Sequence, residues 1–117
     1  MASRVRVKRV YDPPEPQDGY RVLVDRLWPR GVSRERAHLD EWARDLAPSD
    51  QLRKWFGHAP ERFEQFRSRY LEELAGHEEH LGALRAQAER GPLTLVYAAR
   101  DERHNDAVVL AELLRGR

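Results

Sequence analysis

The chain has 117 residues, of which 40% are hydrophobic and 35% charged, and its formal net charge is +1. This length suits one domain with a real core, and the near-neutral charge is unlike that of a dedicated duplex-DNA-binding protein. The sequence has no cysteine, which excludes disulfides, thiolate metal sites and cysteine nucleophiles.

The first two elements are predicted to be strands. Residues 4–10 alternate charged and apolar side chains, which is typical of a half-buried or edge strand. Residues 11–19 form a loop, because their three prolines cannot donate hydrogen bonds to a sheet and an Asp-Gly pair favours a turn. Residues 20–27 return as a second strand, whose continuous apolar centre suits burial on both faces.

Four helices are predicted after this strand. The first runs from a cap at Ser33 to about Leu46, and an apolar face at helical spacing supports it: Leu39, Trp42, Ala43 and Leu46. A short helix follows over 49–57, and a third begins at Pro60 and ends near Gly76. The fourth covers about 78–89, where Gly91-Pro92 stops it.

A third strand at 93–98, a polar loop and a terminal helix over 106–114 complete the pattern. We therefore predict an α/β fold: a single domain with a small, mostly parallel sheet (strands about 4–10, 20–27 and 93–98) and helices packed on its faces. The long helical connection allows a right-handed parallel crossover. No apolar run approaches the roughly 18 residues of a membrane span, and no signal-peptide pattern is visible. We expect a cytoplasmic location and no membrane contact.

The strand ends are the place where the sequence indicates function. If 20–27 and 93–98 are parallel neighbours, their carboxyl ends lie together, and ligands bind at that edge in α/β folds. This placement would bring together two polar groups: Asp25, Arg26, Trp28 and Arg30 from the first end, and Tyr97, Arg100, Asp101, His104 and Asn105 from the second. The helix start after the second group offers free N–H groups to an anion.

Two of these residues are candidates for acid–base catalysis. Asp25 could act as a general base or hold a ligand hydroxyl, and a salt bridge is the structural alternative. His104 could act as the acid because an unperturbed histidine titrates near neutrality, and a solvated loop position is its alternative. Asp101 could orient His104.

The remaining residues of the two groups are candidates for ligand binding. Arg26, Arg30 and Arg100 would hold an anion, because a guanidinium suits bidentate contacts to phosphate or carboxylate. Trp28 or Tyr97 would stack on a base or sugar, and a buried core position is the structural alternative for Trp28. Asn105 could also be the cap of the terminal helix.

The other histidines give weaker indications. His58 follows a Trp-Phe-Gly run, and a structural role in a turn is favoured. His77 and His80 have a spacing that can bind a metal, but no other ligands accompany them, so an exposed polar face and no metal site are expected. The sequence has no P-loop, GxGxxG, nucleophile elbow or HExxH, and we expect no cofactor.

Five blocks of the sequence carry a family resemblance: KRVYDPP, DGYRVLVDRLWPRG, LDEWARDLAPS, LRKWFGH and LVYAARDERHNDAVVLAELL. In this order they resemble the YeaO-like branch of domain-of-unknown-function family 488, and the match covers about Lys8 to Leu114. The resemblance implies one YeaO-like α/β domain over 1–117 and the pairing of the two strand ends, but it implies no substrate. Longer branches of the family have a Cys-His-Arg-type loop near the position of 103–105. Because this chain lacks the cysteine, no thiol mechanism can be carried over.

Three functions are consistent with these patterns. The favoured one is binding of a small anionic ligand, a nucleotide or phosphorylated metabolite, with hydrolysis or glycosidic cleavage as the reaction if the protein is an enzyme. The second is a nucleic-acid-binding or regulatory module that uses the cations of 4–10 and the helices 33–46 and 49–57. The third is a non-catalytic protein-interaction domain that uses Tyr11 and the Pro13–Pro16 loop. The sequence does not indicate an oligomeric state.

Overall fold

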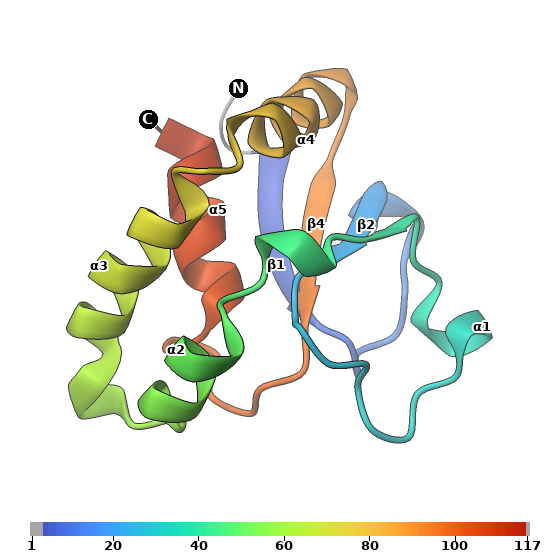
Figure 1. Cartoon of the computed structure of the whole chain (residues 1–117). Coiled ribbons are helices and arrows are strands. Elements are labelled where there is room, and N and C mark those ends of the chain that lie inside the picture. The colour runs from blue at the N-terminus through green and yellow to red at the C-terminus, as the bar shows by residue number, and fades with distance from the viewer. Residues whose placement is uncertain (1–3, 117) are drawn as a thin grey trace.

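A four-stranded sheet runs through the centre of the molecule (Figure 1). The structure is a computed structural model and describes residues 4–116. Its strands lie in the order β1-β4-β2-β3, and each pairing is parallel. Their bounds are β1 (Val5–Arg9), β2 (Tyr20–Leu23), β3 (Glu41–Trp42) and β4 (Leu93–Tyr97). The predicted α/β class and parallel sheet are therefore confirmed.

The strand β4 is the centre of the sheet and is buried along its whole length. It pairs with β1 on one side and with β2 on the other, so Val22 lies beside Leu95 and Leu23 beside Val96. A strand that is covered on both faces is expected to be continuously apolar, as this one is except for Thr94. The predicted adjacency of the second and third strands of the sequence is confirmed by this pairing.

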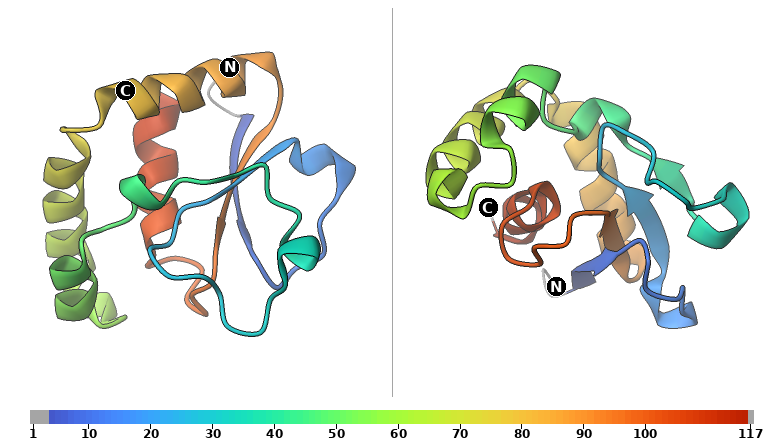
Figure 2. Two further views of the ribbon diagram at one scale, coloured as in Figure 1. Left: turned by 45° about the vertical axis from the view of Figure 1, so that its right-hand side comes forward. Right: turned by 90° about the horizontal axis from the view of Figure 1, so that it is seen from below.

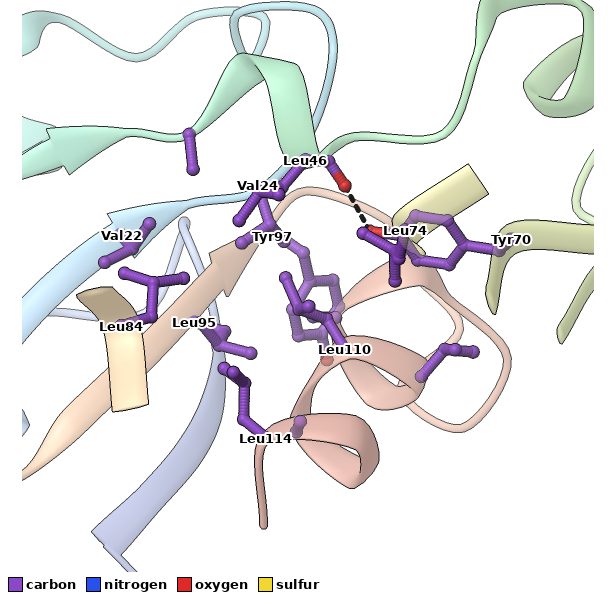
Figure 3. Close-up of a cluster of buried hydrophobic side chains, with 14 of the residues drawn as sticks. Val22, Val24, Leu46, Tyr70, Leu74, Leu84, Leu95, Tyr97, Leu110 and Leu114 are labelled. Atoms are coloured by element: carbon purple, nitrogen blue, oxygen red, sulfur yellow. Dashed lines mark hydrogen bonds between the residues drawn. The ribbon is translucent and has the colours of Figure 1, made fainter. Parts of the chain in front are cut away.

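The main hydrophobic core lies between one face of the sheet and most of the helices. Figures 1 and 2 show α2 (Asp50–Phe56), α3 (Phe63–Leu74), α4 (Glu78–Arg90) and α5 (Asp106–Gly116) gathered there. Helix α5 packs on β1 and β4, and α3 packs on α5. Figure 3 shows the interdigitated side chains, in which the Tyr70 hydroxyl donates a hydrogen bond of 2.6 Å to the carbonyl of Leu46.

The opposite face of the sheet has a smaller covering made of the short α1 (Arg34–Ala37) and of loops. Leu23 and Val96 pack there with Val10 and Ala37. Two tryptophans close this second cluster, Trp28 and Trp42, with ring centroids 5.4 Å apart in an edge-to-face arrangement.

The prediction of one long helix over 33–46 is wrong. Only the four residues of α1 are helical, and they are followed by β3 and a 3-10 turn at Arg44–Leu46. The buried guanidinium of Arg21 ends the helix, because it donates hydrogen bonds to the carbonyls of Ala37 and His38 at 2.8 and 3.0 Å. The N–H of Asp40 then donates to the Arg21 carbonyl, and the Asp40 carboxylate accepts the Arg21 N–H. These two bonds place the following residues beside β2, where they form β3.

The other elements lie close to their predicted positions. The strand predicted over 20–27 ends at Leu23, although the N–H of Val24 still donates to the carbonyl of Val96 at 3.1 Å. The third helix begins with a 3-10 turn at Pro60–Arg62. Helices α2, α4 and α5 agree with prediction within two residues at either end. Within residues 4–116, no helix combines the length and the hydropathy that a membrane crossing requires.

A group of charged side chains, which we call the buried ion network, lies on the α1 side of the sheet: Lys8, Glu15, Asp18 and Arg21. Arg21 and Asp18 are 2% and 3% exposed, and their charged atoms are 2.6 Å apart. Lys8 bridges Asp18 and Glu15 at 3.1 and 3.0 Å. Burial alone would raise the pKa of Asp18, but hydrogen bonds from the Glu15 N–H, Lys8 and Arg21 lower it overall.

Candidate functional site

A cavity of about 750 Å³ opens beyond the carboxyl ends of β2 and β4. Three stretches of chain provide most of its wall: 25–30 after β2, 98–101 with 105–106 after β4, and 53–58 from α2 and its end. Figure 1 shows α2 and the loop after β4 at the same end of the molecule, the lower end in that view. The cavity thus lies where the sequence placed a binding site.

Seven of the nine predicted site residues line this cavity: Asp25, Arg26, Trp28, Arg30, Arg100, Asp101 and Asn105. The lining does not include Tyr97 or His104. Tyr97 is 3% exposed and packs in the main core, where Figure 3 shows it beside Leu110. The His104 ring lies edge-on to Phe63, with centroids 5.1 Å apart. The binding and catalytic roles proposed for these residues stay predictions.

Two neighbouring carboxyl groups line the cavity, Asp25 and Asp106, which we call the acid pair. Asp25 accepts the N–H of Ala98 at 2.9 Å. Burial and the neighbouring Asp25 charge raise the pKa of Asp106 well above its ordinary value. Burial raises the pKa of Asp25 as well, while hydrogen bonds from Asp106 and Ala98 and the charge of His58 oppose the rise.

Two like charges in contact are costly, and on Asp106 this cost acts in the same direction as burial. Each carboxyl group has a backbone donor: Asp25 accepts the Ala98 N–H at 2.9 Å and Asp106 accepts the Ala107 N–H at 2.8 Å. A carboxylate has about four acceptor positions, so Asp25 retains capacity for a ligand.

Local structure explains how Asp25 and Asp106 meet. Asp25 leaves the sheet after β2, and its backbone carbonyl is fixed by a hydrogen bond of 2.8 Å from the Trp42 indole. Asn105 caps α5, accepting the Val108 N–H at 3.0 Å and donating to the Asp101 carbonyl at 2.8 Å, which confirms the predicted cap. Asp106 is consequently the first residue of α5. Sequence reasoning missed Asp106, which follows the predicted cap Asn105 and looks like an ordinary acid at a helix start.

The wall beside the acid pair is aromatic. Phe56 and Phe66 line the cavity and stack on each other with centroids 4.4 Å apart. The ring centroids of Phe66 and Tyr70 are 5.5 Å apart. Burial and the charges of Asp106 and Asp25 raise the pKa of Tyr70 well above its ordinary value. This apolar wall removes water from the carboxyl groups, which is the physical cause of their raised pKa values.

Five cationic side chains form what we call the cationic rim: Arg26, Arg30, Arg53, Lys54 and Arg100. Arg26 donates to the carbonyl of Pro48 at 2.9 Å, and Arg53 and Lys54 pair with Asp50 at 2.6 and 3.2 Å. Within residues 4–116, three members of the rim form no salt bridge: Arg26, Arg30 and Arg100. The Arg53 Nε is buried and has no hydrogen-bond partner there. The rim thus has unused hydrogen-bonding capacity for an anion.

Trp28, Tyr11 and His58 complete the lining. The Trp28 indole donates to the Val32 carbonyl at 2.6 Å, and the Arg34 guanidinium lies 4.8 Å from the ring centroid. Tyr11, which is 44% exposed, donates to the Arg30 carbonyl at 2.9 Å. His58 lies in a turn with a left-handed backbone, φ of 60°, as the sequence favoured, and it is also on the cavity wall.

Asp101 is the other acid of the lining, and its oxygens are occupied by its own loop. One oxygen accepts the N–H groups of Arg103 and His104, at 2.9 and 3.0 Å. The other lies 2.9 Å from the His104 Nδ1, so the predicted Asp101–His104 pair is present. Hydrogen bonds from the Arg103 N–H and the His104 side chain lower the pKa of Asp101. Of the described residues, no group of three or more His, Asp or Glu is arranged to hold a metal ion.

His80 lies outside the cavity and makes contacts that the sequence did not predict. Its Nε2 is 2.5 Å from Glu41 and its Nδ1 is 2.8 Å from Asp45, so it joins α4 to β3 and to the turn that follows. Burial would lower the pKa of His80, but the hydrogen bonds to both carboxylates raise it overall. This histidine bridge is a packing contact, where an exposed polar face had been expected.

With this geometry described, comparison with known proteins places the chain. The sequence model described as "Inactive DUF488-N3 subclade" matches residues 4–117. The chain belongs to this family. The family resemblance noted from the sequence is therefore confirmed.

Curated relatives cover nearly the whole chain. The uncharacterised protein YeaO of Escherichia coli K12 is 49% identical over 111 residues, which are 95% of this chain and 96% of the relative. An uncharacterised protein of Mycobacterium tuberculosis H37Rv, Rv3073c, is 48% identical over 116 residues, 98% of this chain and 97% of the relative. No solved structure matches the chain closely.

Proposed function

We propose that this domain binds a small anionic ligand, a nucleotide or a phosphorylated metabolite, in the cavity at the carboxyl end of the sheet. The observation that carries the proposal is the cationic rim, three of whose arginines form no salt bridge in the described part of the chain. Arginines without a carboxylate partner are suited to bidentate contacts with phosphate. The carboxyl edge of a parallel sheet is also the general place for ligands in α/β folds.

The size and lining of the cavity support the same class of ligand. Its volume of about 750 Å³ lies within the range of small-molecule sites, roughly 300 to 1,000 Å³. Phe56, Phe66 and Trp28 supply apolar surface beside the charged groups. A ligand with a flat or ring-shaped part and a phosphate would use both kinds of surface.

Binding without turnover is the form of the function that we favour. The family's description calls the subclade inactive. The acid pair argues in the same direction, because glycosidases hold their two carboxyl groups about 5 Å or more apart with the scissile bond between them. Asp25 and Asp106 are direct neighbours instead.

The nucleic-acid alternative has less support. The cations of β1 are used within the protein: Arg9 donates to the carbonyl of Ala99, and Lys8 pairs with Asp18. The helix over 33–46, which that alternative needs for a helix-turn-helix, is not formed. A small anionic ligand is therefore the proposal that we develop.

Calorimetric titration tests this proposal with AMP, ribose 5-phosphate and inorganic phosphate as probes. We expect at least one of the two organic phosphates to bind the wild type, and Arg100→Ala to weaken that binding about tenfold or more, as loss of a charge-assisted contact does. Arg90→Ala is the matched control, because Arg90 is exposed on α4 and does not line the cavity. Absence of binding by all three probes, or equal weakening by both variants, would contradict the proposal.

A further inference from the structure

Charge is distributed unevenly in the cavity. Three cations of the rim, Arg30, Lys54 and Arg100, are exposed, whereas Arg26 and Arg53 are partly exposed, as are Asp25 and Asp106. The three exposed cations form an outer end of the cavity, and the acid pair beside the aromatic wall forms what we call its inner end. A ligand that fills it meets both ends, and the two ends require different chemical groups.

The inner end accepts hydrogen bonds and repels anions. Asp25 and Asp106 both line the cavity, and their carboxyl oxygens are hydrogen-bond acceptors. Asp101 adds less to this acceptor surface, because its oxygens already accept the N–H groups of Arg103 and His104 and contact the His104 ring. A phosphate is thus driven toward the rim, and neutral groups that donate hydrogen bonds are favoured at the acid pair.

We propose that the ligand is a hydroxylated organic phosphate of the sugar-phosphate class, bound with its phosphate at the cationic rim and its hydroxyl groups on Asp25 and Asp106. This inference rests on the proposed function, since it assigns the chemical class and the orientation of the ligand in the same cavity. Inorganic phosphate would satisfy only the rim. A phosphate ester without hydroxyls would cover the acid pair with groups that cannot donate to it.

We expect the cavity to prefer a hydroxylated ligand over one without hydroxyl groups. The second kind would cover the oxygens of the acid pair and give them no hydrogen-bond donor. A site built to hydrogen-bond a hydroxyl rejects the analogue that lacks it, because the acceptors are left without donors and without water. The effect in this cavity is smaller than in a closed active site, since the acid pair keeps some exposure. We expect at least a tenfold preference for the hydroxylated ligand.

A matched pair of probes tests the inference by calorimetric titration. Ribose 5-phosphate carries a ring, a phosphate and hydroxyl groups, and tetrahydrofurfuryl phosphate keeps the ring and the phosphate but has no hydroxyl. We expect the wild type to bind the first at least tenfold more tightly. Asp25→Asn should bring the two affinities close to each other, and Asp106→Asn should give an intermediate ratio. Arg100→Ala should weaken both probes by the same factor and leave the ratio unchanged.

The outcomes separate the inference from the proposed function. If both probes bind the wild type equally, or if Asp25→Asn and Asp106→Asn leave the ratio unchanged, the inference is overturned and the anion site remains. If neither probe, AMP nor inorganic phosphate binds, the proposed function itself fails. The variants are compared only where circular dichroism shows that they are folded, and Asp106→Asn is the safer of the two because an amide can still donate to Asp25.

Discussion

The buried ion network and the acid pair use the same residue types in opposite ways. In the network, Asp18 contacts Lys8 and Arg21, and these partners lower its pKa although burial acts in the other direction. In the cavity, Asp25 faces Asp106, and burial raises the pKa of both. Opposite charges meet where the network supports the fold, whereas like charges are held together where the cavity opens.

This difference separates charges that hold the fold together from charges for which we propose a ligand. A buried pair of opposite charges is costly to break, because the remaining charge has no compensation. A pair of like charges lowers the free energy of unfolding. Carboxyl groups with shifted pKa values are concentrated at functional sites. Mutation and pH should therefore act with opposite signs on the two regions.

The largest expected effect comes from breaking the network. Asp18→Asn removes the carboxylate from the buried Arg21 guanidinium, and we expect the free energy of unfolding to fall by about 3–5 kcal/mol at neutral pH. Urea denaturation measures this change. Asp50→Asn is the control, since it alters an exposed pair with Arg53 and should leave the denaturation midpoint nearly unchanged. Equal effects of the two variants on the free energy of unfolding would contradict the expectation that burial makes the Asp18–Arg21 pair more stabilising than an exposed pair.

The pH dependence of the network has a defined sign. Because the folded pKa of Asp18 is lower than its ordinary value of 3.8, its contribution is present above that value and is lost as pH falls through the folded pKa. The difference between wild type and Asp18→Asn should therefore shrink in acid. Denaturation curves at neutral pH and at about pH 3 measure this change.

The next effect has the opposite direction. Asp106→Asn removes a buried carboxyl group whose charged form is disfavoured, and we expect the free energy of unfolding to rise at neutral pH. The folded pKa of Asp106 is higher than its ordinary value of 3.8, so its contribution is present below that value and is lost as pH rises through the folded pKa. The gain in the variant should accordingly increase with pH. Thermal unfolding of both proteins across the pH range measures it, and a loss of stability would contradict our description of the acid pair.

The smallest effect belongs to the histidine bridge. His80→Gln should lower the free energy of unfolding by about 1 kcal/mol or less near pH 6, because the imidazole lies between two partly exposed carboxylates. Since the folded pKa of His80 is raised above 6.5, this contribution is complete below that value and disappears as pH rises through the folded pKa. Urea denaturation near pH 6 and near pH 9 checks the trend. A difference that grows with pH would contradict it.

The sheet could be predicted because its central strands have an unambiguous signal. The apolar stretches at 20–27 and 93–98 and the helical segment between them favoured a parallel crossover, and β2 and β4 are paired in this way. No signal in the sequence indicates that the helix predicted over 33–46 is interrupted. Its apolar residues were assigned to one face, yet Leu39 and Trp42 pack on the α1 side of the sheet. Ala43 and Leu46 pack in the main core on the other side.

The contacts that decide this segment are distant in the sequence. Arg21 donates to the carbonyls of Ala37 and His38, which are 16 and 17 residues away in the sequence, and no local periodicity indicates such a contact. The same holds for the site. Asp25 was found because it ends an apolar strand, but Asp106 looks like an ordinary acid in the first turn of a helix. Only the pairing of β2 with β4 brings the two carboxyl groups together.

The tryptophan positions provide an optical readout of the cavity. Trp28 lines the cavity and touches Trp42, which in turn holds the Asp25 carbonyl, whereas Trp55 is not part of the lining and lies against Arg62 and Arg69 on the helical side. Two of the three indoles therefore report on the strand ends and the third serves as an internal reference. Intrinsic fluorescence, with Trp28→Phe to assign the signal, can follow occupancy of the cavity without any label attached to the protein.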